Sequence, residues 1–412
     1  MHRSTQLGLL AVGGLSPAVY AYSQIGDARI RALVATSAAV ALLGFFATLR
    51  LIPAFTGKTS SRGIAGKDLN KKGTPAGDIP IPEAAGLAPG AVFLLCIICF
   101  QLLHYYDIGS LLGFVRSGFR GTIRREEALP DSWLVDYNAA LATIGFMLFL
   151  GFADDVLDIR WRVKLLLPLF AALPLLAAYS GGTGVAVPKP LQALLGLPSY
   201  MELGLAYQGY IVALTIFCTN SINIFAGVNG LEAGQTFIVA CAILLHNLLS
   251  VAGSAGDGGA AGRDGHLFSA YLMLPLASTT LALLAFNWFP SSVFVGDTFT
   301  YFAGMVIAVA GILGHFSETL LLFLIPQILN FLYSLPQLLK VVHCPRHRLP
   351  VFDPKTGLLR PKDAPDWNLV NLALQLGGNC GENALCVRLL AFQAACCALG
   401  FAARWALAGV YK

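Results

Sequence analysis

The sequence predicts an all-α, polytopic integral membrane protein with about ten transmembrane helices and polar loops gathered on one side. Of its 412 residues, 56% are hydrophobic and only 12% are charged, and the mean hydropathy is +0.70. A soluble domain carries about 25% charged residues, so this composition indicates many membrane crossings. The apolar residues also cluster into long runs, which is the second observation behind the prediction.

Crossing the hydrocarbon core takes about 20 mostly apolar residues. Ten runs approach that length, and the spacers between them are too short for a soluble domain of ordinary size. The predicted helices occupy residues 32–53, 89–103, 135–152, 165–179, 203–219, 236–252, 267–286, 300–314, 319–339 and 385–408. We therefore expect residues 29–412 to form one integral membrane domain.

Residues 1–28 form a leader whose role the sequence leaves open. An apolar stretch at 7–22 follows Arg3, as in a signal peptide, but it contains Pro17 and is short for a membrane span. A cleaved signal, a short additional helix and a disordered extension are all compatible with it.

Ten crossings place the connecting segments alternately on two sides. One side receives every segment that resembles a motif, namely 54–88, 153–164, 220–235, 287–299 and 340–384, and the N-terminus falls on the other. The first side also holds thirteen lysines and arginines besides Lys164, so the positive-inside rule makes it cytosolic. Four arginines on the opposite side weaken this signal: Arg116, Arg120, Arg124 and Arg125.

The charge and the cysteines exclude two classes of function. The net charge of +5 is spread over several loops, which suits anionic headgroups or phosphates better than nucleic acid. Six of the nine cysteines lie in apolar runs, and the Cys96–Cys99 pair lacks the soluble context of a redox motif. We interpret the cysteines as packing residues.

The strongest candidate site is the charged stretch 151–164, which joins two apolar runs. Within eleven residues it contains three carboxylates and three cations: Asp154, Asp155, Asp158, Arg160, Arg162 and Lys164. Acids at the end of a membrane segment usually serve ions, protons or phosphates, because an aspartate deeper in the bilayer costs about 2.5–3.5 kcal/mol. The alternative is a charged interfacial loop that only ends two helices.

Polar groups interrupt the apolar pattern at further places on the same side. The loop 66–83 offers ionic and hydrogen-bonding groups, and it could equally be a solvated loop. Asn220 and Asn223 lie one helical turn apart on one face, and Asn229 follows. These amides could bind a cation or a nucleobase, or they could hydrogen-bond between helices.

A lone carboxylate and a basic cluster complete the pattern. Asp297 lies among aromatics where a helix begins, and with Asn223 it meets the needs of Mg²⁺, which takes one or two protein oxygens plus phosphates. Phe294 offers a stacking face for a planar base. The segment 343–350 offers arginine forks for phosphate, and zinc lacks a second ligand pair there.

These motifs together resemble the polyprenyl-phosphate N-acetylhexosamine-1-phosphate transferases. The resemblance rests on Asp-Asp-Val-Leu-Asp-Ile-Arg-Trp-Arg-Val-Lys (154–164), Asn-Ser-Ile-Asn-Ile-Phe-Ala-Gly-Val-Asn-Gly (220–230) and Phe-Val-Gly-Asp-Thr-Phe (294–299). Cys-Pro-Arg-His-Arg-Leu-Pro (344–350) is similar to the eukaryotic branch. The resemblance runs from about residue 51 to the last predicted span.

The resemblance implies a ten-helix enzyme of the endoplasmic reticulum membrane, multi-pass, usually homodimeric, with its active site facing the cytosol. It would transfer GlcNAc-1-phosphate from UDP-GlcNAc to dolichyl phosphate and release UMP, with Mg²⁺ as cofactor, as the first step of N-glycan precursor assembly. A relative acting on undecaprenyl phosphate is the alternative within the family. A secondary transporter is the alternative from another class, because its intramembrane acids look similar.

Residue roles follow from the matched motifs. Asn223 and Asp297 would bind the metal, Lys164 and Arg346 the pyrophosphate, Leu69, Glu83, Asn229 and Phe294 the uridine, and His347 and Arg348 the N-acetyl sugar. Asn220 joins the substrate-binding set, and Asp158 either assists the acceptor phosphate or pairs with Arg162. Asp154 and Asp155 would be catalytic with Lys164, as general base or by orienting the lysine. We expect direct attack by dolichyl phosphate without a covalent enzyme intermediate.

Overall fold

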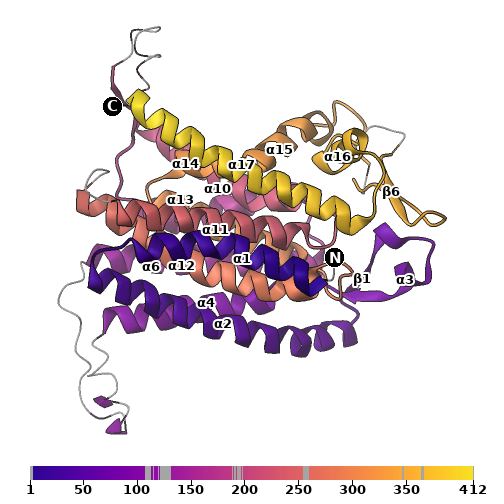
Figure 1. Cartoon of the computed structure of the whole chain (residues 1–412), viewed down its shortest axis with the longest axis horizontal. Helices are drawn as coiled ribbons and strands as arrows, with labels where there is room; N and C mark the ends of the chain where they lie inside the picture. The colour runs from indigo at the N-terminus through magenta and orange to yellow at the C-terminus, as the bar shows by residue number, and fades with distance from the viewer. Residues whose placement is uncertain are drawn as a thin grey trace.

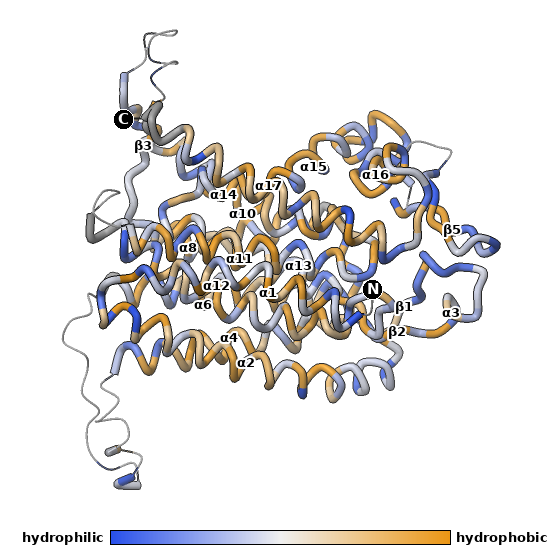
Figure 2. The backbone as a smooth tube through the Cα atoms, viewed as in Figure 1, coloured by the Kyte–Doolittle hydropathy of each residue, from blue (hydrophilic) through white to orange (hydrophobic). Residues whose placement is uncertain are grey.

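The structure is a computed structural model that describes residues 3–106, 113–114, 116–118, 120, 131–187, 189, 192, 196, 198–253, 259–345, 348–362 and 366–411. Long helices lie side by side, and short strands and helices extend from one end of the bundle (Figure 1). Figure 2 shows hydrophobic residues along the helices and hydrophilic segments concentrated toward their ends. The described chain is therefore predominantly helical, and the all-α prediction is confirmed.

The helices and strands have the following bounds. The helices are α1 (Arg3–Ser23), α2 (Ala28–Ser61), α3 (Pro75–Asp78), α4 (Leu87–Tyr105), α6 (Asp131–Leu157), α7 (Trp161–Ala171), α8 (Leu173–Ala178), α10 (Leu205–Ile224), α11 (Leu231–Ala252), α12 (Gly259–Asn287), α13 (Gly296–Leu313), α14 (Ser317–Phe323), α15 (Ile325–Leu338), α16 (Leu369–Gly377) and α17 (Glu382–Tyr411), with a 3-10 turn, η1 (Leu69–Lys71). Three two-stranded antiparallel sheets pair β1 (Ala65–Lys67) with β2 (Pro80–Pro82), β3 (Gly184–Ala186) with β4 (Tyr200–Glu202), and β5 (Val351–Asp353) with β6 (Leu358–Arg360).

Every one of the ten predicted runs is helical, but two of them are not single straight helices. Among the described residues, eight helices are long and apolar enough to cross a membrane, or nine if the bent pair α14–α15 counts as one span. That pair bends by 74°. Proline explains both breaks, because Pro174 in α8 and Pro326 in α15 lack the N–H that would continue the preceding helix. The chain is a multi-pass membrane protein.

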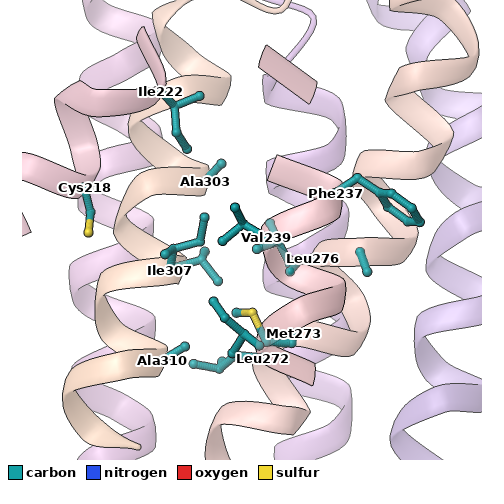
Figure 3. Close-up of a cluster of buried hydrophobic side chains, with 14 of the residues drawn as sticks. Cys218, Ile222, Phe237, Val239, Leu272, Met273, Leu276, Ala303, Ile307 and Ala310 are labelled. Carbon is teal, nitrogen blue, oxygen red and sulfur yellow. The ribbon is translucent and has the colours of Figure 1, made fainter. Parts of the chain in front are cut away.

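Helix α13 is the centre of the bundle. All of its residues from Thr298 to Leu313 are buried, and it packs against α6, α10 and α12. Figure 3 shows Ala303, Ile307 and Ala310 of this helix in a cluster with hydrophobic side chains of α11 and α12. A helix that is apolar on every side is stable only when neighbours surround it, so α13 is a fixed reference for the site at its N-terminal end.

A glycine brings α10 and α13 into unusually close contact. A Cβ atom at Gly304 would lie 2.2 Å from the carbonyl oxygen of Cys218 and 2.7 Å from the Cα of Thr219. Small residues at such crossings let helix backbones approach in membrane proteins. The crossing therefore sets the distance between the C-terminal end of α10 and the N-terminal end of α13, where Asn223 and Asp297 lie.

The leader forms a helix, which changes the predicted side of the N-terminus. α1 packs along α11, and its first residues reach the same end of the bundle as β1 (Figure 1). The Arg3 guanidinium donates to the carbonyl oxygens of Ala285 and Pro290, and the Gln6 Oε1 atom accepts from Trp288. The prediction that the N-terminus lies opposite the motif loops is wrong, because the leader adds one more pass along the bundle.

Backbone hydrogen bonds join two of the motif segments at this end. The Phe294 N–H donates to the carbonyl oxygen of Pro82 over 2.8 Å. In return, the N–H groups of Ala85 and Gly86 donate to the carbonyl oxygens of Phe294 and Val295 over 3.1 and 3.0 Å. The segments after α2 and after α12 are thereby held together beside the start of α13.

The prediction that the cysteines of the apolar runs are packing residues is confirmed except at Cys99, which is exposed. All nine cysteines are free, and seven of them are buried. Cys218 and Cys241 lie in the hydrophobic core with their helices packed around them. They act as small apolar side chains.

Candidate functional site

Two adjacent cavities lie at the end of the bundle where the motif loops meet. The smaller, of about 240 Å³, is lined by residues that include Asp68, Leu69, Asn223 and Asn229. The larger, of about 410 Å³, is lined by Glu83, Asp154, Asp155, Asp158 and Lys164, together with three residues of the segment 294–297.

One short segment separates the two cavities. Phe294, Gly296 and Asp297 line both, so we call residues 294–297 the shared wall. The smaller cavity is mixed in character, with amides and an aromatic ring, whereas the larger is lined mainly by charged groups. Such a pair of compartments could receive two ligands whose reacting groups meet at the shared wall.

Lys164 connects two carboxylates of the site, Asp154 and Asp297. Its Nζ atom lies 2.8 Å from the Asp154 Oδ2 atom and 3.0 Å from the Asp297 Oδ2 atom. Burial alone would lower the pKa of Lys164, but Asp297 and Asp154 outweigh it, so the pKa lies above the ordinary lysine value. The lysine is therefore a fixed positive charge at the shared wall.

Asp154 is held on all sides. Its side chain is 1% exposed, and its Oδ2 atom accepts from the Tyr301 hydroxyl over 2.9 Å as well as from Lys164. Its Oδ1 atom accepts from the Ile159 N–H over 3.0 Å. This leaves Asp154 little freedom to move toward a ligand, which favours a role in orienting Lys164 over proton abstraction.

Asp155 has a different partner, the N-terminus of α13. Its Oδ1 atom accepts from the Asp297 N–H over 2.7 Å, and its Oδ2 atom accepts from the Thr298 N–H and hydroxyl. A carboxylate at the start of a helix accepts hydrogen bonds from the free N–H groups there, and its negative charge interacts favourably with the positive end of the helix dipole. Gly296 permits this approach, because a Cβ there would lie 2.1 Å from the Asp155 carboxylate. Asp155 therefore sets the position of Asp297.

Asn223 and Asp297 are in direct contact. The Asn223 amide donates to the Asp297 Oδ1 atom, and it lies 3.4 Å from the Thr300 hydroxyl. Among the described residues, no three histidine, cysteine, aspartate or glutamate side chains lie close enough to hold a metal by themselves. One carboxylate and one amide do fit Mg²⁺, which takes few protein oxygens when phosphates supply the rest.

Glu83 lines the larger cavity from the loop before α4. Burial, and then the nearby Asp297 carboxylate, raise the pKa of Glu83 above the ordinary glutamate value. Asp158 lines the same cavity with a positive φ of 49°. The larger cavity thus contains four carboxylic acids besides Asp297 and a single lysine, a balance that an added cation would improve.

Two buried carboxylates contact Asn229, and neither was among the predicted site residues. The Asp68 Oδ2 atom accepts from the Asn229 amide over 3.0 Å, and the Glu382 Oε1 atom accepts from the Asn229 N–H over 2.9 Å. Glu382 comes from the first turn of the last helix, 153 residues after Asn229. Asp68 stands inside the motif loop 66–71, a signal that could have identified it; Glu382 carries none.

The structure does not bring every predicted residue to the cavities. The Arg348 guanidinium donates to the Ser334 hydroxyl and the Trp367 carbonyl oxygen, each over 2.6 Å, and burial lowers its pKa. Asn220 donates to the Ile216 carbonyl oxygen on its own helix. Arg346 and His347 lie outside the described residues. Leu69, Asn229 and Phe294 line the smaller cavity, as a shared binding role requires.

Comparison with known proteins agrees with this architecture. The family model for glycosyl transferase family 4 matches residues 137–315. The chain is 47% identical over 382 residues to the UDP-N-acetylglucosamine–dolichyl-phosphate N-acetylglucosaminephosphotransferase of Dictyostelium discoideum, covering 88% of each chain. It is 44% identical to proteins of the same name from Saccharomyces cerevisiae, over 78% of this chain and 72% of that one, and from Schizosaccharomyces pombe, over 78% and 71%.

The multi-pass helical bundle and these relatives together identify an integral membrane sugar-phosphate transferase. The match to the Dictyostelium protein covers 88% of this chain, which is enough to include the motif segments from residue 66 to residue 350. The chain belongs to the family of the UDP-N-acetylglucosamine–dolichyl-phosphate N-acetylglucosaminephosphotransferases.

Proposed function

We propose that this protein transfers GlcNAc-1-phosphate from UDP-GlcNAc to dolichyl phosphate, giving GlcNAc-PP-dolichol and UMP. The observation that carries the proposal is Lys164, a fixed cation between Asp154 and Asp297 at the wall shared by two cavities. A transfer between two phosphates needs such a cation, because both reactants are negatively charged. The named relatives supply the identities of donor and acceptor.

The smaller cavity is the site for the uridine of the donor. Leu69, Asn229 and Phe294 line it and offer an apolar edge, an amide and an aromatic ring. Glu83 contributes from the neighbouring cavity. The sugar would lie toward the segment with Arg348, and His347 and Arg346 belong to the same motif.

The acceptor phosphate occupies the larger cavity, beside Lys164 and Asp158. From there its oxygen attacks the β-phosphorus of the donor directly, and the bond to the α-phosphate oxygen breaks as UMP leaves. Lys164 stabilises the charge that develops on the transferred phosphoryl group and on the leaving phosphate. Asp154 keeps Lys164 oriented, and Asp155 keeps Asp297 in place through the start of α13.

Mg²⁺ is the cofactor of this proposal, with Asn223 and Asp297 as its protein ligands. When bound, the ion supplies positive charge that neutralises the donor pyrophosphate. The two side chains already touch each other through the Asn223 amide nitrogen, so a turn of that amide would bring its oxygen beside the Asp297 carboxylate without movement of either helix.

The proposal places the protein in the endoplasmic reticulum membrane with the cavities facing the cytosol, as a homodimer whose catalytic domain spans residues 29–412. The reaction would begin N-glycan precursor assembly. Support for the cytosolic side comes from the lysines and arginines in the loops around the site.

The experiment is UMP release by the purified chain in lipid nanodiscs. We expect release to require both dolichyl phosphate and Mg²⁺ and to be stopped by a uridine-mimicking inhibitor such as tunicamycin. Undecaprenyl phosphate is the matched acceptor control and should be used less well. Release that continues without any lipid phosphate, or a trapped sugar-phosphate adduct on Asp154, would contradict the direct transfer. Folded protein that binds UDP-GlcNAc without turnover would favour a transporter.

A further inference from the structure

Two buried carboxylates, which lie far apart in the sequence, accept hydrogen bonds from Asn229. Asp68 belongs to the loop after α2 and is 3% exposed, and Glu382 begins α17 and is 5% exposed. Neither carboxylate lies among the groups that the transfer chemistry uses. Both instead contact the amide residue that lines the smaller cavity.

The two carboxylates act on different parts of Asn229. Glu382 accepts its backbone N–H through Oε1, and the same oxygen accepts from the Asn70 side chain over 3.0 Å. Asp68 accepts the Nδ2 atom of its side chain, and the Lys71 ammonium lies 2.6 Å from the same Asp68 oxygen. The backbone and the side chain of Asn229 are thus both fixed.

This arrangement determines which way the amide points. An ionised carboxylate only accepts hydrogen bonds, and Asp68 forms an ion pair with Lys71. The Asn229 nitrogen must therefore face Asp68, which leaves the amide oxygen as the group available to the cavity. A carbonyl oxygen in that place can accept a hydrogen bond from a ligand but cannot donate one.

We propose that Asp68 and Glu382 are positioning residues for base specificity. They hold Asn229 so that its oxygen accepts the N3–H of uracil. Cytosine has no hydrogen on N3 and would leave a lone pair facing the amide oxygen. The inference rests on the proposed function, in that it takes the smaller cavity as the uridine site.

The expected preference is considerable. Leaving a buried acceptor without its donor weakens binding about 10- to 100-fold. A site built to hydrogen-bond one group of its substrate rejects analogues that lack it far better than an apolar pocket does. We expect UDP to bind the wild-type protein at least tenfold more tightly than CDP.

The experiment compares UDP and CDP as ligands of the full chain in nanodiscs, together with KM and kcat for UDP-GlcNAc. Asp68→Asn gives Asn229 a partner that can donate a hydrogen bond as well as accept one. The side-chain amide of Asn229 can then flip and exchange the positions of its oxygen and nitrogen. We expect the UDP-to-CDP preference to fall to within about threefold, with KM raised about tenfold and kcat within threefold of wild type.

The role of Glu382 is tested by two substitutions, one that removes its hydrogen-bond acceptor and one that keeps it. Glu382→Ala removes the acceptor for Asn229 and Asn70, and KM should rise about tenfold. Glu382→Gln keeps an oxygen acceptor and should restore KM to within about threefold of wild type. If Asp68→Asn or Glu382→Ala does not fold, Glu382→Asp keeps a carboxyl group but withdraws it from Asn229 by one methylene, and it should give the same rise in KM.

Gln393→Ala is the matched control on the same helix. Gln393 is buried and donates to the Phe323 carbonyl oxygen, away from both cavities. Its loss should lower thermal stability and leave the UDP-to-CDP preference unchanged. The inference is overturned if active wild-type protein binds UDP and CDP equally, or if the variants keep the wild-type preference and KM. Wild-type protein without UMP release would instead remove the proposed function.

Discussion

Lys164 and Asp154 form the ion pair on which the residue-scale chemistry depends. Lys164→Met leaves Asp154 and Asp297 close together with no cation between them. We expect UMP release to fall at least 100-fold and the free energy of unfolding to fall by about 1–3 kcal/mol. Activity assays and thermal unfolding in nanodiscs measure the two effects.

The same pair offers a double-mutant cycle. In an Asp154→Asn background, Lys164 has lost one of its two carboxylate partners, so the loss of stability caused by Lys164→Met should be smaller by about 0.5–3 kcal/mol. Strictly additive losses would show that the 2.8 Å contact contributes no coupling.

Asp155 differs from its neighbour because its partners are the N–H groups at the start of α13. Asp155→Asn replaces one carboxylate oxygen by an NH2 group, which then faces a backbone N–H at the start of α13 instead of accepting from it. We expect a stability loss of about 1–2 kcal/mol and at least a tenfold lower kcat, since Asp297 would shift. Thr298→Val, which removes only the hydroxyl contact, is the milder control. An equal effect of both variants would contradict this assignment.

Glu83 predicts a pH-dependent effect on stability. Its raised pKa means that the folded protein binds this proton more tightly than the unfolded chain. Ionised Glu83 therefore opposes folding as the pH rises from the ordinary glutamate value through the raised one. Without Mg²⁺, Glu83→Gln should raise the thermal midpoint at pH 7.5 and have little effect at pH 4. A raised midpoint at pH 4 alone would contradict the sign.

At the scale of elements, the crossing of α10 and α13 fixes the candidate metal ligands. Gly304→Ala places a methyl group against the backbone of Cys218, so the helices must separate. We expect a loss of about 1–3 kcal/mol in stability and at least a tenfold fall in activity. Gly209→Ala in α10, where nothing lies within 4 Å, is the matched control and should be neutral. Full activity in Gly304→Ala would show that the crossing distance is not critical.

Apolar length predicted every long described helix except the leader helix α1, because each run must bury or present a continuous hydrophobic surface. It did not predict the breaks within α7–α8 and α14–α15, since prolines in membrane helices can kink or end them depending on their neighbours. Nor did it decide the leader. The hydrogen bonds of Arg3 and Gln6 come from contacts 282 or more residues away, which no local pattern contains.

For the whole molecule, the helical leader predicts that the two termini lie on opposite sides of the membrane. Figure 1 places N and C at opposite ends of the bundle. In sealed microsomes, we expect an N-terminal tag and a tag in the loop at α3 to be cut together by added protease, and a C-terminal tag to be protected. Protection of the N-terminal tag together with the C-terminal one would contradict this arrangement.

Most of the site could be predicted from the motifs, because Asp154, Lys164, Asn223, Asp297 and Phe294 lie in segments that the structure brings together. The missing part is Glu382, which looks like an ordinary acid at the start of a helix until folding places Asn229 beside it. The sequence also did not predict which partners the individual acids contact. Adjacent acids in sequence, Asp154 and Asp155, face a lysine and a helix end respectively, and only tertiary packing separates those roles.

The shared wall has a consequence for inhibitor chemistry. Because residues 294–297 are bonded to the loop before α4 and to the start of α13, the two cavities keep a fixed offset. A uridine mimic could therefore be joined to a phosphonate by a linker of matching length. Once the uridine mimic occupies the smaller cavity, the tethered phosphonate would bind the larger one at a high effective concentration. The gain in avidity can reach about 100-fold or more without any new contact, and it vanishes when the linker is too short to pass the wall.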